Sequence, residues 1–110
     1  MTPSQAVNIL VRECHQNSID HGFWSSQNIG EKLTLVNTEL SEFFEKYRKD
    51  RMNEPDEHCP EFKNSTIEIA DAIIRLFDLA GWLEMHDLGE AMQAKMMYNK
   101  SRPFMHGKKC

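Results

Sequence analysis

The segment from Ile67 to Leu83 places the strongest constraint on how this chain can fold. Its apolar residues fill two neighbouring rows at helical spacing, so a helix here is apolar around most of its circumference and must bury much of that surface. Four charged residues nevertheless line one face of the same helix at i, i+3, i+7 and i+10: Glu68, Asp71, Arg75 and Asp78. Carboxylates beside so much apolar surface are costly unless they are paired or bind a cation.

Helical spacing recurs along the rest of the chain, and no segment shows the strict alternation of a half-buried strand. Start and stop signals predict helices over about residues 2–20, 28–47, 61–85 and 87–101. We therefore expect one all-α domain over residues 1–110, a helical bundle of about four helices that is oligomeric. Residues 49–60 are expected to form a connector or a disordered loop, and residues from about 103 to 110 a basic tail.

Capping signals mark the expected helix ends. Three residue pairs have the spacing of a capping box: Thr2 with Gln5, Asn28 with Glu31, and Asp87 with Glu90. The third helix is expected to begin at Glu61 or Ser65 and to end near Met85. Pro103 is expected to stop the fourth helix, because proline cannot donate the next helical hydrogen bond.

Composition narrows the classes of protein. The net charge of −4 argues against general nucleic-acid binding, and no apolar run approaches the roughly 20 residues that cross a bilayer. The N-terminus lacks the basic and apolar regions of a secretory signal, so a cytoplasmic location is expected. Cys14, Cys59 and Cys110 are widely spaced and odd in number, which indicates free thiols rather than a disulfide framework or a zinc site.

The second predicted helix carries a matching acidic pair, Glu39 and Glu42, also at i, i+3. If this helix packs antiparallel to the third, both residues can meet Glu68 and Asp71. Four carboxylates without Cys or His suit Mg²⁺, or Mn²⁺, rather than zinc. Other interpretations remain open, since acidic pairs at this spacing occur elsewhere in the chain. Glu39 and Glu42 can be a solvated helix flank, Glu68 can cap with Ser65, and Asp71 can pair with Arg75.

Lys95, Asn99 and Arg102 share one face of the fourth predicted helix at i, i+4, i+7. Lysine provides a point charge for a phosphate, and arginine provides a planar fork of donors. The alternative is that basic residues near a helix C-terminus simply offset the helix dipole.

Three runs in this order resemble the MazG-like family of nucleoside triphosphate pyrophosphohydrolases: Glu39-Leu40-Ser41-Glu42, the run from Glu68 to Ala80, and Lys95 to Pro103. That family carries ExxE on one helix, ExxD on the next, and then a Lys…Asn…Arg element. The resemblance covers roughly residues 22–108.

This resemblance implies that four carboxylates are Mg²⁺ ligands: Glu39, Glu42, Glu68 and Asp71. It implies that Lys95, Asn99 and Arg102 bind the triphosphate, some of them from a neighbouring subunit of a dimer or tetramer. It also implies Trp24 as a platform for the base; the alternative is a core aromatic. No role is implied for Asp78.

The reaction implied by this resemblance is water attack at the α-phosphorus of a nucleoside triphosphate, which yields a monophosphate and pyrophosphate. Glu39 or Glu42 would hold the attacking water as general base. Two alternatives remain open at this point. One is a histidine-dependent phosphohydrolase of the HD type, suggested by His86-Asp87 and requiring ligands such as His21. The other is a non-catalytic helical module that binds nucleotide or protein.

Overall fold

The fold is all-helical, as expected. The computed structural model describes residues 1–104, in which four helices and no strand are found. They are α1 (Pro3–Asp20), α2 (Ile29–Arg48), α3 (Asn64–Trp82) and α4 (Leu88–Ser101). Most of the predicted basic tail, including Cys110, lies outside the described residues. Cys14 and Cys59 are free thiols, as predicted. None of the four helices in the described part of the chain is both long and apolar enough to cross a membrane.

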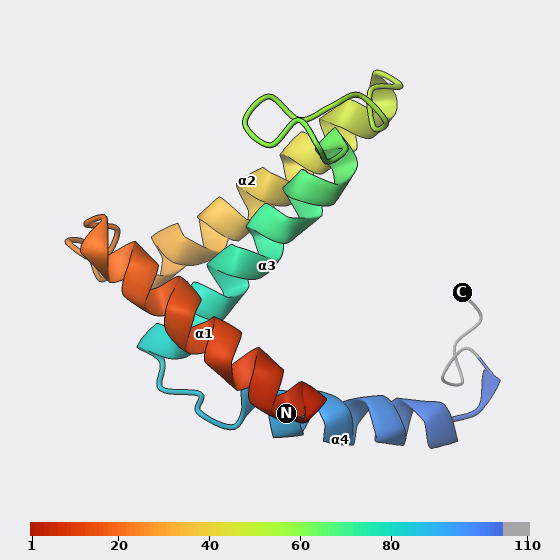
Figure 1. The fold of residues 1–110 in the computed structure, drawn as a ribbon. Coiled ribbons are helices and arrows are strands. Elements are labelled where there is room, and N and C mark those ends of the chain that lie inside the picture. The colour runs from red at the N-terminus through yellow and green to blue at the C-terminus, as the bar shows by residue number, and fades with distance from the viewer. Residues whose placement is uncertain (105–110) are drawn as a thin grey trace.

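Helix α3 lies at the centre of the arrangement. It runs antiparallel beside α2, and α1 crosses its C-terminal half (Figure 1). Helix α4 packs against the beginning of α1 and then leads away from the α2–α3 pair (Figure 1). The antiparallel pairing of α2 and α3 is the condition under which their acidic residues can converge.

The first two helix starts follow the sequence signals. Thr2 Oγ1 accepts a hydrogen bond from the Gln5 amide, and Gln5 Oε1 accepts one from the Thr2 amide, which completes the predicted capping box. Asn28 Oδ1 accepts from the Glu31 amide at 3.1 Å and caps α2 as predicted. Both helices therefore begin where local chemistry places them.

The start of α4 differs from the prediction. Asp87 occupies the N-cap position, but its side chain makes no capping hydrogen bond. Asn8 on α1 caps the helix instead, because its Oδ1 accepts from the Gly89 amide at 2.9 Å and its Nδ2 donates to the Glu90 carboxylate. The prediction of an Asp87–Glu90 capping box was wrong because a side chain 81 residues away in sequence satisfies the helix end.

Helix α3 begins at Asn64 and ends at Trp82, three residues before the predicted Met85. Glu84 adopts a left-handed φ of 57°, and the Met85 amide donates to the Ala80 carbonyl. This is the hydrogen bond of a Schellman motif, which closes a helix by reversing the backbone. The segment after Trp82 therefore turns toward α4 instead of continuing the helix.

The connector between α2 and α3 is folded rather than disordered. The buried Asp56 accepts hydrogen bonds from the amides of His58 and Cys59, both at 2.9 Å. At its end, the Asn64 side chain donates to the Arg51 carbonyl. These hydrogen bonds hold the connector over one end of the α2–α3 pair.

Asp78 joins three parts of the chain. Its Oδ1 accepts hydrogen bonds from His15 Nδ1 on α1 and from Trp24 Nε1 in the following loop, both at 2.8 Å. The Trp24 ring stacks on Trp82 with centroids 4.4 Å apart. The role of Asp78, left open by the sequence, is therefore to tie α1 and the 21–28 loop to α3.

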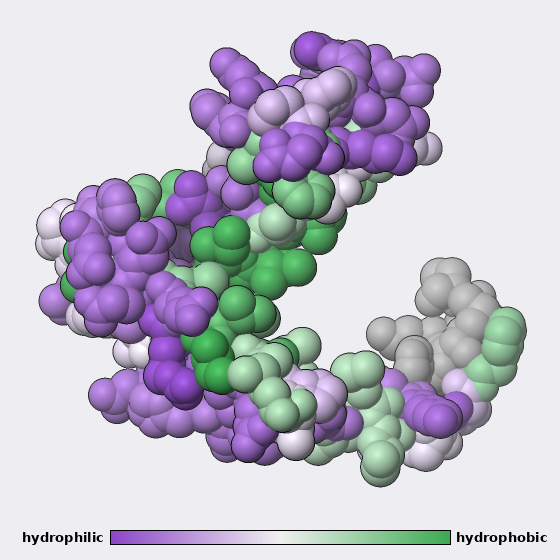
Figure 2. All heavy atoms as spheres, in the orientation of Figure 1, coloured by the Kyte–Doolittle hydropathy of each residue, from purple (hydrophilic) through white to green (hydrophobic). Residues whose placement is uncertain are grey.

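One apolar face of α3 stays exposed in the single chain. Figure 2 shows apolar surface gathered between the α2–α3 pair and α4. An apolar groove of about 500 Å³ lies there, and its lining comes from α3, the turn after it and α4: Ile73, Leu76, Phe77, Leu79, Ala80, Leu83, Met85, Leu88 and Met92. The expectation that α3 buries much of its apolar surface is thus met on only part of that surface within one chain.

We predict that Gly89→Ala destabilises the protein by about 1–3 kcal/mol, as overpacking does. A Cβ at position 89 would lie 2.3 Å from the Ser4 carbonyl oxygen, so α4 would have to move off α1. Chemical denaturation followed by circular dichroism measures this loss.

The matched control is Gly30→Ala on α2, whose Cβ meets only the Asn28 side chain. There the gain in helix propensity, about 0.5–1 kcal/mol, should offset the slight crowding. Equal losses in the two variants would show that the α1–α4 contact does not have the described geometry.

Candidate metal centre

Acidic side chains from α2 and α3 meet between the two helices. Glu39, Glu42 and Glu68 each offer one oxygen, and these three atoms lie within 4.8 Å of one another. We call these residues the acidic trio. Within residues 1–104, no histidine or cysteine belongs to such a group of potential ligands, so the histidine-dependent alternative through His21 and His86 gains no support.

The trio is only partly open to solvent. Glu39 is buried at 7% exposure, Glu68 is half-buried and Glu42 is exposed. Glu68 Oε2 is buried and has no hydrogen-bond partner among the described residues. A buried carboxylate oxygen without a partner is costly, and a bound cation would remove that cost.

The electrostatics of the site reflect this crowding. Burial, followed by the negative charges of Glu42, Asp71 and Glu39, raises the pKa of Glu68 from 4.5 to about 7. Burial and the charge of Glu39 also raise the pKa of Asp71, while Arg75 acts in the opposite direction. The protein groups around these carboxylates therefore leave an excess of negative charge at neutral pH.

Asp71 lies beside the trio rather than in it. It lines a polar cavity of about 350 Å³, which we call the acidic cavity, together with all three trio residues. Lys46 also lines this cavity, as do Asp56 and His58 from the connector. The structure thus gathers all four predicted ligands around one cavity, with three of them close enough to share an ion.

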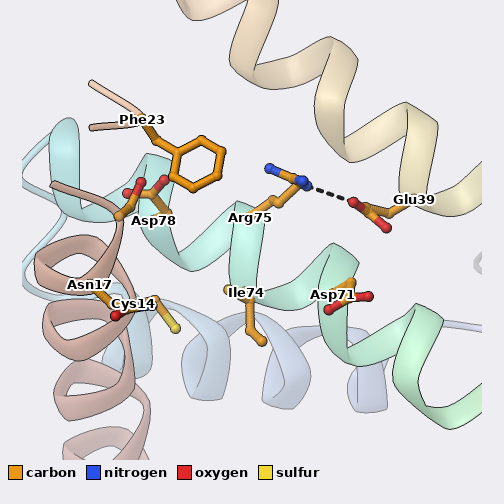
Figure 3. A pocket seen from close by; sticks show the side chains of 9 residues that line it. Cys14, Asn17, Phe23, Glu39, Asp71, Ile74, Arg75 and Asp78 are labelled. Carbon is orange, nitrogen blue, oxygen red and sulfur yellow. Dashed lines mark hydrogen bonds and ion pairs between the residues drawn. The ribbon is translucent and has the colours of Figure 1, made fainter. Parts of the chain in front are cut away.

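The alternative roles considered for the acids of α3 were wrong. Glu68 is not a capping partner of Ser65, because α3 begins with Lys63 at the N-cap position and without a side-chain cap. Arg75 does not bridge to Asp71 on its own helix; its Nε donates to Glu39 Oε1 on α2 at 2.8 Å (Figure 3). The sequence placed Arg75 on the acidic line but gave no sign of this contact between helices.

A second cavity of about 240 Å³ adjoins the trio, and we call it the side cavity. Glu39 and Asp71 line both cavities, so the two meet at these residues. Figure 3 shows side chains from α1, the 21–28 loop, α2 and α3 around it. The half-exposed ring of Phe23 offers an aromatic face there.

Trp24 lies elsewhere. It is 7% exposed, stacks on Trp82 and lies beneath the Lys32 ammonium, whose Nζ is 4.8 Å from the ring centroid. This environment favours a core aromatic over the platform for a base. Sequence reasoning did not single out Phe23, although it is the residue next to Trp24.

The basic residues of α4 are not brought to the acids within one chain. Lys95 Nζ lies 4.5 Å from the centroid of the Tyr98 ring, and the Arg102 guanidinium lies 5.5 Å from the same centroid. Lys95, Asn99 and Arg102 line neither the acidic cavity nor the side cavity. Figure 1 shows α4 leading away from the α2–α3 pair.

Comparisons with known proteins add no relative: no family model, no curated protein and no solved structure matches this chain. The three sequence elements and the geometry of the acidic trio are therefore the observations that bear on function.

We predict that the stability of the metal-free protein falls as pH rises. The folded-state pKa of Glu68, about 7, exceeds its ordinary value of 4.5, so the folded protein holds this proton more tightly than the unfolded chain does. This stabilisation is complete below the ordinary value and is lost as pH rises through about 7. Melting temperatures in EDTA between pH 5 and pH 8, roughly the window of that titration, measure it.

Glu68→Gln should flatten this pH dependence, because the titrating group is gone and the shape is kept. Glu45→Gln, which alters an exposed α2 carboxylate paired with Arg48 and Lys49, should leave the slope as in the wild type. An unchanged slope in Glu68→Gln would contradict the raised pKa.

Proposed function

We propose that this protein is a Mg²⁺-dependent nucleoside triphosphate pyrophosphohydrolase that hydrolyses (d)NTPs to (d)NMPs and pyrophosphate. The observation that supports this most directly is the convergence of Glu39, Glu42 and Glu68 from two helices on one spot. The order of the ExxE, ExxD and Lys…Asn…Arg elements supports the same function. It also supports a MazG-like arrangement of the all-α fold.

The donor set fits a hard divalent cation. Mg²⁺ binds oxygen at about 2.0–2.1 Å, so two of its ligands lie at most about 4.2 Å apart. The trio oxygens lie within 4.8 Å of one another, and small side-chain rotations bring them into that range. Mn²⁺ accepts the same oxygen ligands. When bound, the metal supplies neutralisation of phosphate charge and a lowered pKa of a coordinated water.

The acidic residues take different roles in this reaction. Glu39 is buried at 7% exposure, whereas Glu42 is exposed at the cavity and is better placed to accept a proton from the attacking water. Asp71 completes the acidic wall on the side shared by both cavities. We therefore assign the role of general base to Glu42 and a metal-binding role to Glu39.

Self-association belongs to this proposal. The exposed apolar groove of α3 and α4 would be covered by a second copy in a dimer or tetramer. Such a copy would supply Lys95, Asn99 and Arg102 to the acidic site of its neighbour, because α4 does not reach the site of its own chain.

A non-catalytic binding module is the second candidate function, since the same exposed groove also suits a protein partner.

We predict Mg²⁺-dependent release of pyrophosphate from at least one of a panel of canonical and modified (d)NTPs, and no release in EDTA. Glu42→Gln should lower kcat by about a hundredfold or more, the usual contribution of a general base. Asp71→Asn should lower it as well, and Glu45→Gln is the matched control on the exposed side of α2. Full turnover in Glu42→Gln would remove Glu42 from the mechanism, and no turnover of any nucleotide would favour the binding module.

We also predict that two inactive variants restore each other. Lys95→Ala keeps the acidic trio and Glu68→Gln keeps the basic face, so a mixed oligomer holds one intact site made from two chains. The two variants are refolded together and assayed against each variant refolded alone. Activity no higher than that of the separate variants would show that the site is not shared between chains.

A further inference from the structure

Within residues 1–104, Arg75 is the only basic residue that forms an ion pair with the acidic trio, and neither the sequence motifs nor the resemblance gave it a role in binding substrate. Its Nε donates to Glu39 Oε1 at 2.8 Å, and the Arg75 side chain is 31% exposed while that of Glu39 is 10% exposed. Among the described residues, its two terminal nitrogens have no hydrogen-bond partner. Most donors of the guanidinium are therefore available to another ligand.

Arg75 provides positive charge in a cavity that is otherwise lined by carboxylates and uncharged side chains. Within residues 1–104, Arg75 is the only basic residue in the lining of the side cavity, which also holds the carboxylates of Glu39, Asp71 and Asp78. Asp78 is already engaged by His15 and Trp24, so its charge is partly balanced. An anion that enters this cavity meets repulsion from the carboxylates and one source of attraction, the guanidinium of Arg75.

Glu39 is a potential ligand for two different cations, a metal ion and the Arg75 guanidinium. It belongs to the group of oxygens that can share a metal ion, and it also accepts the Arg75 hydrogen bond. A divalent ion on the trio would repel the guanidinium and weaken its hold on Glu39. The guanidinium can instead make a cation–π contact with the Phe23 ring, whose centroid lies 6.0 Å from Arg75 Cζ on the same side of the cavity (Figure 3).

We propose that Arg75 is a substrate-binding residue that occupies Glu39 in the metal-free protein, releases it when a divalent metal binds, and then binds the phosphate chain of the nucleotide. This inference rests on the proposed function and adds to it an exchange of partners at Glu39. It differs from a purely positioning role, in which Arg75 stays on Glu39 and orients that carboxylate toward the metal.

The two roles predict opposite changes in metal affinity. Binding of Mn²⁺ alone, without nucleotide, is measured by electron paramagnetic resonance on the wild type, Arg75→Gln and Arg75→Lys. If Arg75 competes with the metal for Glu39, Arg75→Gln should bind Mn²⁺ several-fold more tightly than the wild type does. Weaker or unchanged Mn²⁺ binding by Arg75→Gln would overturn the exchange.

The second measurement is binding of inorganic triphosphate in the presence of saturating Mn²⁺, which is independent of the base and of turnover. Loss of charge-assisted hydrogen bonds should weaken this binding about tenfold or more in Arg75→Gln. Arg75→Lys, which keeps the charge but not the fork of donors, should lie between Arg75→Gln and the wild type. Unchanged triphosphate binding in Arg75→Gln would also overturn the proposal.

Arg12→Gln is the matched control, because it makes the same change in charge at an exposed position of α1 away from both cavities. It should leave both affinities at their wild-type values, and circular dichroism verifies that each variant folds. Failure of the proposed function gives a different result: neither the wild type nor Arg75→Gln would then bind Mn²⁺. Mn²⁺ binding that Glu68→Gln abolishes supports the metal site, whatever Arg75→Gln does.

Discussion

The antiparallel packing of α2 against α3 is the constraint on which the candidate site depends. It buries Glu39 against a helix whose Glu68 and Asp71 line the same cavity, and it leaves Glu68 Oε2 buried without a partner among the described residues. The Arg75–Glu39 ion pair relieves part of this repulsion across the helix interface. Such a carboxylate cluster opposes folding while its negative charge is not neutralised. The same packing that stabilises the fold therefore concentrates negative charge that a cation would neutralise.

Local signals predicted a helix start well wherever the capping side chain belongs to the same helix end. The capping box of Thr2 and Gln5 and the cap at Asn28 fixed the starts of α1 and α2. The start of α4 could not be predicted in this way, because the capping group is Asn8 on another helix. The fixed connector likewise depends on the buried Asp56, whose surroundings exist only after α2 and α3 have packed.

For the candidate site, spacing predicted acids that share a face on each of two helices, and the antiparallel pairing of α2 and α3 brings three of them together. Spacing could not show which cation would contact them, since Arg75 pairs across to α2 rather than along its own helix. It also could not separate Trp24 from Phe23: one is held between Trp82 and Lys32, while the other faces the side cavity. Such distinctions depend on tertiary contacts between residues far apart in sequence.

The close approach of Gly89 to Ser4 has a consequence for how the two ends of the chain communicate. Helix α4 is anchored at its first turn by α1, through this contact and through Asn8. The rest of α4, which carries Lys95 and Asn99, extends away from that anchor (Figure 1). A change of a few degrees at residues 4 or 8 would therefore be magnified along α4, and the N-terminal turn would set where the C-terminal basic residues point.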